Sequence, residues 1–544
     1  MSYCISRHGI LANMYESRRN SIIADNQKLL YTMNYIQTFY PQGKPVLENG
    51  YGWLRPEYNL MSWALSCLQL RKIYDHVDLY TDNMGKNILI DELGLPYNKV
   101  YTDFNEYDQI DQHLWALPKI YTYSKQQNPF LHIDGDVYLF DKLPEKFNQS
   151  ELIAQNMEYS SKYYLDTMVQ LKRHFTYIPE VVKSDFNSDK SFLAVNAGIL
   201  GGNDVIFFKN YTKEAYTYIK RNQKHLKEID ADKFNVFFEQ HLFYALAHKA
   251  CKKVSLLFED LENSYGYTHL ADFLEINNRV KYIHLLGNFK RDEDLCLQMA
   301  ITLRNLYPEY YYRICRLYHR KHLPFCITTP EINSCSIEEY HQICLNAYHG
   351  NKISNTQHHV ADASKEMELL TRTEIGRQHP EKLDKFADDV NKICKKFCHL
   401  SKEFVYGRDL ECMSWQDKAS RGDRITISKE ACIITSSYNW GGKLNQLRRS
   451  SIEYYERVNF DLEGEYYCIV VPELLAKGYQ IHDIDDVELC IFEELHEPKT
   501  LEELLDSCTK YFDDEIIRKN YLKYEIFIGT LIKRLISIKA IHSI

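Results

Sequence analysis

Short apolar runs alternate with amphipathic helical patterns over residues 28–300. The runs are YIQTFY at 35–40, VDLY at 77–80, FLHI at 130–133, FLAV at 192–195, KVSLLF at 253–258 and YIHLL at 282–286. Helical periodicity separates several of them, most clearly at 58–74 and at 233–249. Strands that alternate with helices predict an α/β domain of Rossmann-like type with a mostly parallel sheet. In such sheets, ligands bind beyond the carboxyl ends of the strands.

The pattern changes near residue 301. Residues 301–423 are predicted to form helices joined by polar segments, for example at 364–374 and 381–397, and they carry no recognisable chemical motif. We therefore expect a helical middle region there.

A third pattern begins near residue 424. The stretch RITISKEACIITSS predicts a hairpin of strands, and GEYYCIVV predicts a further strand. Three helical patterns follow, and the third has Leu522, Ile526, Leu531 and Leu535 on its apolar side. The last apolar stretch, LISIKAI, suits a strand or a helix end. Residues 424–544 are therefore expected to form a small α+β, winged-helix-like domain.

Composition and charge narrow the class of protein. The chain has 544 residues, 45% of them hydrophobic, and a formal net charge of −9 without a basic stripe, which argues against nucleic acid as the main partner. Its 15 cysteines are scattered and contain no CxxC pair, as expected for a protein of the reducing cytoplasm. The sequence contains no run of about 18 apolar residues, so we expect no membrane span, and we recognise no secretory signal.

The stretch FLHIDGDVYLF places Asp134 and Asp136 one glycine apart, directly after an apolar run. One interpretation is a type I′ hairpin turn, because Asp-Gly tolerates positive φ. The other is a metal–diphosphate site, since Mn²⁺ and Mg²⁺ prefer carboxylate oxygens and often complete their coordination with substrate phosphates. A bound cation would also offset the repulsion between the two carboxylates.

Three later stretches favour the second interpretation. They are VNAGILGGND, with Asn196 and Gly198 after a strand; FEQHLF, with Glu239 and Gln240 on a helix; and YIHLLGNFKRD, with His284, Gly287 and Lys290 at a strand end. Taken singly, each has an ordinary explanation: a turn, a solvated helix face and a core histidine.

In this order, the motifs resemble the GT-A glycosyltransferases with a DxD motif, especially the retaining glycogenin and galactosyltransferase-like group. The resemblance covers residues 28–300 and implies a GT-A fold with a nucleotide-sugar donor, expected to be a UDP-sugar. It implies that Asp136 and His284 bind Mn²⁺ or Mg²⁺, with Asp134 sharing the metal or holding the donor ribose. It further implies diphosphate contacts from Gly287 and Lys290.

Other roles implied by the resemblance concern the sugar and the acceptor. As catalytic residues, Asn196, Glu239 and Gln240 would face these groups. Gly198 and Lys119 would belong to the donor-binding residues; Lys119 stands where the family often has a basic residue, although it could equally be an ordinary surface lysine. The sequence departs from the family pattern at Glu239, where an aspartate is usual, and after Lys290, where Arg291 replaces a Pro-Trp pair.

The C-terminal sequence is similar to the small PqqD-like domains that recognise precursor peptides, in which a leader peptide adds as an extra strand. This resemblance implies that the acceptor is a ribosomally made precursor peptide. An alternative is a non-catalytic, peptide-binding scaffold with a degenerate GT-A domain. A nucleotidyltransferase would share the Asp pair, but the glycine-rich basic signature expected near its first strand is absent from the sequence.

Overall fold

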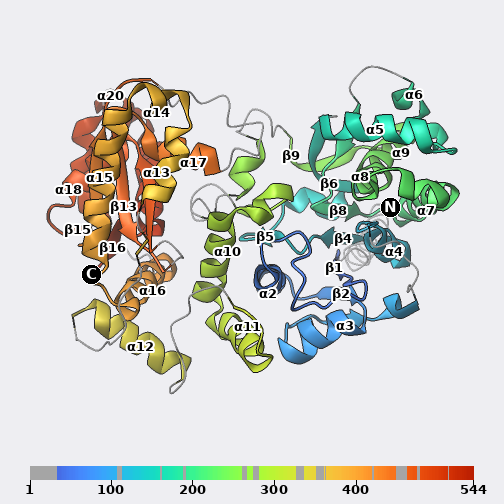
Figure 1. The fold of residues 1–544 in the computed structure, drawn as a ribbon, viewed down its shortest axis with the longest axis horizontal. Helices are drawn as coiled ribbons and strands as arrows, with labels where there is room; N and C mark the ends of the chain where they lie inside the picture. Colours follow the sequence, from blue (N-terminus) through green and yellow to red (C-terminus); the bar gives the residue numbers. More distant parts are fainter. Residues whose placement is uncertain are drawn as a thin grey trace, which may run out of the picture. The chain divides into compact units, whose positions relative to one another are not determined.

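The computed structural model describes residues 33–106, 113–159, 162–187, 192–259, 266–271, 273, 281–325, 336–350, 360–361, 363–418, 422–448, 462–474, 478–512 and 514–544 (Figure 1). Contacts divide the chain into two compact units. One comprises the segment up to residue 46 with 66–137 and 141–261, and the other comprises 47–65, 138–140 and 262–544.

An eight-stranded mixed sheet organises the first unit. Its strands are β1 (Asn34–Phe39), β2 (Val77–Thr81), β3 (Lys99–Tyr101), β4 (Phe130–Ile133), β6 (Leu152–Tyr159), β7 (Leu193–Val195), β8 (Ile199–Gly202) and β9 (Val254–Phe258). Their order is β3-β2-β1-β4-β8-β6-β7, and β9 also pairs with β6. The pairs β3–β2, β2–β1, β1–β4 and β6–β9 are parallel, whereas β8 is antiparallel to both β4 and β6. The α/β prediction with a parallel-dominated sheet is confirmed.

The strand predicted at 282–286 lies in a separate ribbon. It is β10 (Tyr282–His284), which pairs with β5 (Val137–Leu139) in a two-stranded sheet. The predicted runs did not include β3, β5, β6 or β8. In β8, Gly201 is required by close packing, because a Cβ there would lie 2.1 Å from the carbonyl oxygen of Phe130.

Helices and single turns connect the strands of the first unit. They are α3 (Asn83–Lys86), η1 (Asn87–Glu92), η2 (Asp103–Glu106), α4 (Leu117–Lys125), η3 (Glu145–Gln149), α5 (Lys162–His174), η4 (Glu180–Val182), α6 (Lys183–Phe186), α7 (Val205–Asn222), η5 (Gln223–Glu228), α8 (Ala231–Val236), η6 (Phe237–His241) and α9 (Leu242–Lys249); α2 (Pro56–Ile73) follows β1. The core buries Phe130 of β4 and Ala154 of β6 together with aromatic side chains of α4, α7 and the α8–η6–α9 helix. This packing fixes α4 and η6 beside the end of β4.

The regular elements among the described residues of 301–423 are helices. The described helices between residues 287 and 418 are η9 (Gly287–Arg291), α10 (Glu293–Leu306), α11 (Pro308–Arg320), α12 (Ile337–Tyr348), α13 (Ser364–Thr371), α14 (Glu374–Gln378), α15 (Pro380–Phe397) and α16 (Lys402–Lys418); η7 (Gly266–Ala271) precedes β10. Among the described helices, none is long and apolar enough to cross a bilayer.

The C-terminal part contains two small antiparallel sheets with helices. Its elements are β11 (Arg424–Ile427), β12 (Cys432–Ser436), α17 (Trp440–Arg448), β13 (Tyr466–Pro472), β14 (Tyr479–Ile484), α18 (Asp486–Glu494), β15 (Lys499–Thr500), α19 (Leu501–Cys508), η11 (Thr509–Tyr511), α20 (Asp514–Ser537) and β16 (Ile541–Ser543). On β13, Ile469 and Val471 pack against the α18–α20 side, while Cys468 and Val470 pack toward α15, because alternate side chains of a strand point to opposite faces.

Two sequence predictions are wrong in this part. The predicted hairpin at 424–437 does not form, because β11 pairs with β15 and β16, whereas β12 pairs with β13. On α20, Leu531 and Leu535 are buried as expected, but Leu522 and Ile526 are 69% and 61% exposed. The helix is interrupted at Asn520, and periodicity cannot tell whether an apolar face has a neighbour to pack against. The stretch LISIKAI contains both a helix end and the start of β16.

Candidate active site

The chain turns sharply between β4 and β5, and this turn carries Asp134 and Asp136. The N–H of Val137 donates to the carbonyl oxygen of Asp134 at 3.1 Å, which closes the turn. However, β4 pairs with β1 and β8 while β5 pairs with β10, so the two strands do not form a hairpin. Gly135 does not adopt a positive φ. The type I′ hairpin interpretation is therefore wrong.

Buried polar side chains of β1 and α2 hold this turn in place. The side-chain amide of Gln37 donates to the hydroxyl of Ser66 at 2.8 Å and to the carbonyl oxygen of Ile133 at 3.3 Å. The hydroxyl of Ser66 donates to the carbonyl oxygen of Val137 at 2.7 Å. Both Gln37 and Ser66 are fully buried. They satisfy backbone groups on either side of the two aspartates and so restrict the direction of both carboxylates.

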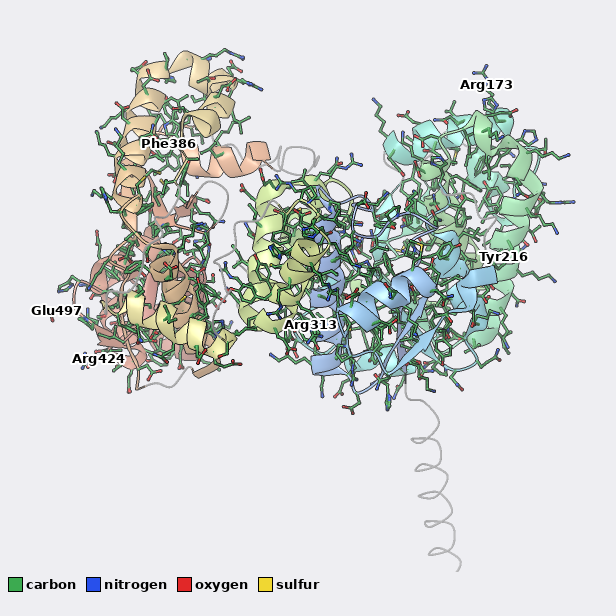
Figure 2. The ribbon with its side chains drawn as sticks, turned by 60° about the horizontal axis from the view of Figure 1, so that its bottom comes forward. Arg173, Tyr216, Arg313, Phe386, Arg424 and Glu497 are labelled. Carbon is green, nitrogen blue, oxygen red and sulfur yellow. The ribbon has the colours of Figure 1, made fainter. Side chains whose placement is uncertain are left out.

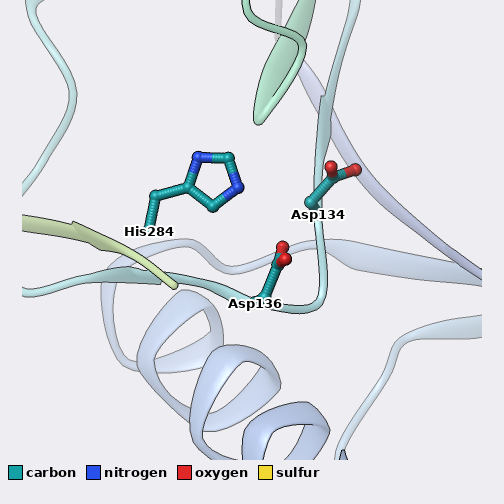
Figure 3. Close-up of side chains that lie close together, drawn as sticks. All are labelled: Asp134, Asp136 and His284. Carbon is teal, nitrogen blue, oxygen red and sulfur yellow. The ribbon is translucent and has the colours of Figure 1, made fainter. Parts of the chain in front are cut away.

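Asp134, Asp136 and His284 come together as the sequence predicts. One ligand atom from each side chain lies within 4.8 Å of the other two, and Figure 3 shows the three side chains close together. Asp136 and His284 are buried, at 8% and 4% exposure. The pairing of β5 with β10 accounts for the meeting, because Asp136 directly precedes β5 and His284 ends β10.

The donor set fits a divalent cation. Two carboxylates and one imidazole are ligand types that suit Mn²⁺ or Mg²⁺. The Oδ1 atom of Asp134 is buried and accepts no hydrogen bond, so it retains a lone pair for a ligand.

Lys119 of α4 is the counter-charge of Asp134. Its Nζ lies 2.7 Å from Oδ2 of Asp134 and 3.2 Å from Oε1 of Glu239, and its side chain is only 12% exposed. The surface-lysine interpretation is therefore wrong. Burial alone would lower the pKa of Lys119, but the neighbouring carboxylates Asp134 and Glu239 outweigh burial and raise it, so the lysine is charged. Burial raises the pKa of Asp134, and Lys119 opposes that rise.

His132 also approaches Asp134 but is not an ion-pair partner. Its Nδ1 lies 3.5 Å from Oδ1 of Asp134. Burial and the nearby Lys119 ammonium lower the pKa of His132 well below its usual value, so the ring is neutral. Its Nε2 lies 3.0 Å from the hydroxyl of Thr38.

Glu239 is fully buried, contrary to the ordinary expectation for a helical glutamate. It lies in η6, a single π-helical turn that interrupts the α8–α9 helix, and such turns are frequent at functional sites. The hydroxyl of Tyr123 donates to its Oε1 at 3.4 Å, and its Oε2 has no hydrogen-bond partner. Burial raises the pKa of Glu239, and Lys119 opposes the rise.

The Asn-Ala-Gly turn lies against the first aspartate. The N–H of Asp134 donates to the carbonyl oxygen of Gly198 at 3.0 Å, and the N–H of Gly198 donates to Oδ1 of Asn196 at 3.0 Å. The side-chain amide of Asn196 donates to Oε1 of Glu158 at 2.9 Å. The turn is thus held between the end of β4 and the end of β6.

Two further residues, Glu158 and Tyr164, belong to this cluster and were not found from the sequence. The hydroxyl of Tyr164 lies 2.8 Å from Oε2 of Glu158 and 2.8 Å from Oε1 of Gln240. It therefore links Gln240 to the Asn196 turn. Glu158 was missed because apolar and polar residues do not alternate regularly along β6, so this segment was not predicted as a strand.

The end of β10 leads into a turn that brings Gly287 and Lys290 together with a loop before α2. Gly287 has a φ of +54°, which favours glycine. The N–H of Leu54 donates to the carbonyl oxygen of Lys290 at 2.8 Å, and the Lys290 Nζ lies 5.9 Å from the centre of the Trp53 ring. The loop bends sharply, with Gly52 at a φ of +92°. Sequence reasoning did not connect this loop with the lysine.

The family match covers the part of the chain that contains these residues. Residues 33–317 match the model of a protein family described as "Family of unknown function (DUF6734)". This chain belongs to that family. Every candidate site residue, from Lys119 to Lys290, lies inside the matched region. A comparison with curated proteins finds no match.

Proposed function

We propose that this chain is a divalent-metal-dependent glycosyltransferase with a GT-A-type domain that uses a nucleotide-sugar donor. The observation that carries the proposal is the convergence of Asp134, Asp136 and His284, with ligand atoms within 4.8 Å of one another. The Asp pair follows the carboxyl end of β4, where ligands bind in α/β sheets. The order of the remaining motifs, as the sequence resemblance implies, adds support for a nucleotide-sugar donor.

On this proposal the three ligands hold one Mn²⁺ or Mg²⁺ ion, and Gly287 and Lys290 receive the diphosphate of the donor. When bound, the cation supplies Lewis-acid stabilisation of the leaving diphosphate. The Lys290 ammonium stabilises the same developing negative charge. Lys119 favours the ionised forms of Asp134 and Glu239 and restricts the orientation of both carboxyl groups.

The sugar and the acceptor face the Asn196 turn and Gln240. The acceptor hydroxyl attacks the anomeric carbon as the bond from that carbon to the diphosphate oxygen breaks. In the retaining course that the resemblance implies, the leaving oxygen takes up the acceptor proton, so that no side-chain base is required. Tyr164 and Glu158 position Asn196 and Gln240 through the contacts described above.

A donor screen tests the proposal. UDP- and GDP-sugars would be added with Mn²⁺ to the native chain, to Asp136→Asn and to Asp141→Asn, a matched change at an exposed carboxylate. Thermal stabilisation and release of free sugar would be measured. We expect one donor to give both in the native chain and in Asp141→Asn, and neither in Asp136→Asn. The absence of a metal-dependent response to every donor would refute the transferase.

A second candidate function is favoured by a different observation, the exposed apolar surface at the start of α20. Tyr521, Leu522, Ile526 and Phe527 are 50%, 69%, 61% and 40% exposed, and large exposed apolar patches often mark binding surfaces. The alternative is a peptide-binding scaffold without transferase activity; in the transferase, the same surface would capture a precursor-peptide acceptor.

Peptide selection distinguishes these cases. A random peptide library would be selected on the native chain and counter-selected on Leu522→Glu/Ile526→Glu. Peptides that bind only the native chain, together with a negative donor screen, favour the scaffold. Peptides that bind only the native chain and become glycosylated favour the transferase with a peptide acceptor. If both proteins retain the same peptides, the α20 surface is not the binding site.

A further inference from the structure

A groove lies between α4 and α7, and the proposed transfer reaction does not use it. Its volume is about 410 Å³, within the usual range of ligand sites. It is lined by Ser124, Lys209, Thr212, Lys213, Tyr216, Thr217 and Lys220. Tyr216 marks the position of the groove in Figure 2.

The lining is cationic. The described lining residues comprise three lysines and four hydroxyl-bearing side chains and include no carboxylate. Glu214, the acidic residue of α7, instead accepts a hydrogen bond from the hydroxyl of Tyr177 at 2.8 Å. The lining of the groove therefore presents positive charge to a ligand.

The lysine spacing places the three ammonium groups along one stripe. Lys209 and Lys213 are one helical turn apart, and Lys220 lies two turns further, so the stripe extends over roughly 16 Å at 1.5 Å per residue. Like charges one turn apart on a helix repel each other. A bound anion would relieve that repulsion. All three lysines are exposed, so they can turn toward a ligand.

We propose that this groove binds the phosphate groups of an anionic ligand. Its length suits a diphosphate or a longer polyphosphate chain better than a single phosphate, because no single phosphate could reach all three lysines. The hydroxyl groups of Ser124, Thr212 and Thr217 donate to backbone carbonyl oxygens, so the lysine ammonium groups are the donors that would contact the phosphate oxygens. The proposal does not depend on the transferase activity.

The groove is distinct from the metal-ligand cluster. On α4, Lys119 and Tyr123 face Glu239, whereas Ser124 faces the groove. On α7, the hydroxyl of Tyr211 donates to the carbonyl oxygen of Glu239 at 2.8 Å, whereas Lys213 lines the groove. The same two helices thus support the site on one side and the groove on the other.

Calorimetric titration with inorganic pyrophosphate tests the proposal. Chelator is included so that divalent metal does not contribute, and the ionic strength is kept at about 0.05 M, where screening is modest. Four proteins are compared: the native chain, Lys213→Gln/Lys220→Gln, Asp136→Asn, and Lys162→Gln/Lys172→Gln on α5 as the charge-matched control. Vesicles with anionic phospholipid form a second arm, which separates a free polyphosphate from a lipid headgroup.

We expect saturable binding by the native chain, by Asp136→Asn and by the α5 control. Affinity in Lys213→Gln/Lys220→Gln should fall at least about tenfold, the loss expected for one charge-assisted contact. Binding only to vesicles, weakened by the same double change, would also support the groove and assign the phosphate to a lipid. No saturable binding in either arm, or binding unaffected by that change, would overturn the proposal.

Discussion

Replacing Lys119 by methionine should destabilise the chain by about 3–5 kcal/mol, the cost of breaking a buried ion pair on one side. The distances from Lys119 to the two carboxylates set the size of the electrostatic attraction that is lost. At an effective dielectric constant of about 20, charges separated by 2.7 Å attract by roughly 6 kcal/mol and charges separated by 3.2 Å by roughly 5 kcal/mol. Much of this attraction is offset because the substitution also removes the cost of burying the ammonium group.

The net loss of stability then comes from the buried carboxylates of Asp134 and Glu239, which no longer have a counter-charge. A second substitution, Glu239→Gln, removes one of them, so the double variant Lys119→Met/Glu239→Gln should be more stable than Lys119→Met alone. In the native background, by contrast, Glu239→Gln should be destabilising, because Lys119 loses a partner. The two changes are therefore expected to be coupled by more than about 1 kcal/mol.

Urea unfolding at neutral pH would measure these effects, with pulsed hydrogen–deuterium exchange of peptides from residues 117–139 reporting on the region. Lys125→Met is the matched control on the same helix, because Lys125 is exposed and should cost less than about 0.5 kcal/mol. Equal losses in Lys119→Met and Lys125→Met, or additive effects of Lys119→Met and Glu239→Gln, would refute the role of Lys119 as a shared counter-charge.

Three further predictions concern other parts of the chain. Burial lowers the pKa of His542 to about 4, so between pH 6.5 and 5 the unfolded chain binds a proton that the folded chain does not. The free energy of unfolding should therefore fall by roughly 1.5 kcal/mol over this pH range. In urea titrations, His542→Asn should remove this part of the pH dependence. An unchanged slope would contradict the burial of a neutral ring. Ser66→Ala should lower the free energy of unfolding by about 1–3 kcal/mol, because the turn carrying Asp134 and Asp136 loses two hydrogen bonds. It should also weaken Mn²⁺ binding in calorimetric titrations; unaltered metal affinity would argue against a role of Ser66 in holding this turn. Leu522→Glu should cost less than about 0.5 kcal/mol in thermal melts, whereas Leu531→Glu at a buried position should abolish cooperative melting of the C-terminal part; equal effects would mean that Leu522 is packed.

The strands that the sequence predicted are runs dominated by apolar residues, although the short apolar strand β5 was not among them. Residues 130–133 form β4 as expected, because both faces of this strand are buried. By contrast, β8 contains two glycines, whose role is close backbone packing, and glycine carries no apolar signal. The hairpin at 424–437 was misassigned because local pattern identifies strands but not their partners.

In the candidate site, too, the sequence did not reveal contacts between residues distant along the chain. The order of motifs predicted that Asp134, Asp136 and His284 would meet, and they do. The burial of Glu239 and the participation of Glu158 were not predictable, since each depends on tertiary contacts made by residues distant in sequence. A glutamate on a helix gives no sign of whether a buried lysine faces it.

Electron spin echo spectroscopy of Mn²⁺ bound together with a nucleoside diphosphate would test the central claim most directly. Couplings to nitrogen and to phosphorus report the atoms within a few bonds of the ion. We expect one bound Mn²⁺ coupled both to a histidine nitrogen, with that coupling lost in His284→Gln, and to diphosphate phosphorus. A bound ion without the histidine coupling, or one that shows no phosphorus when the diphosphate is present, would contradict it.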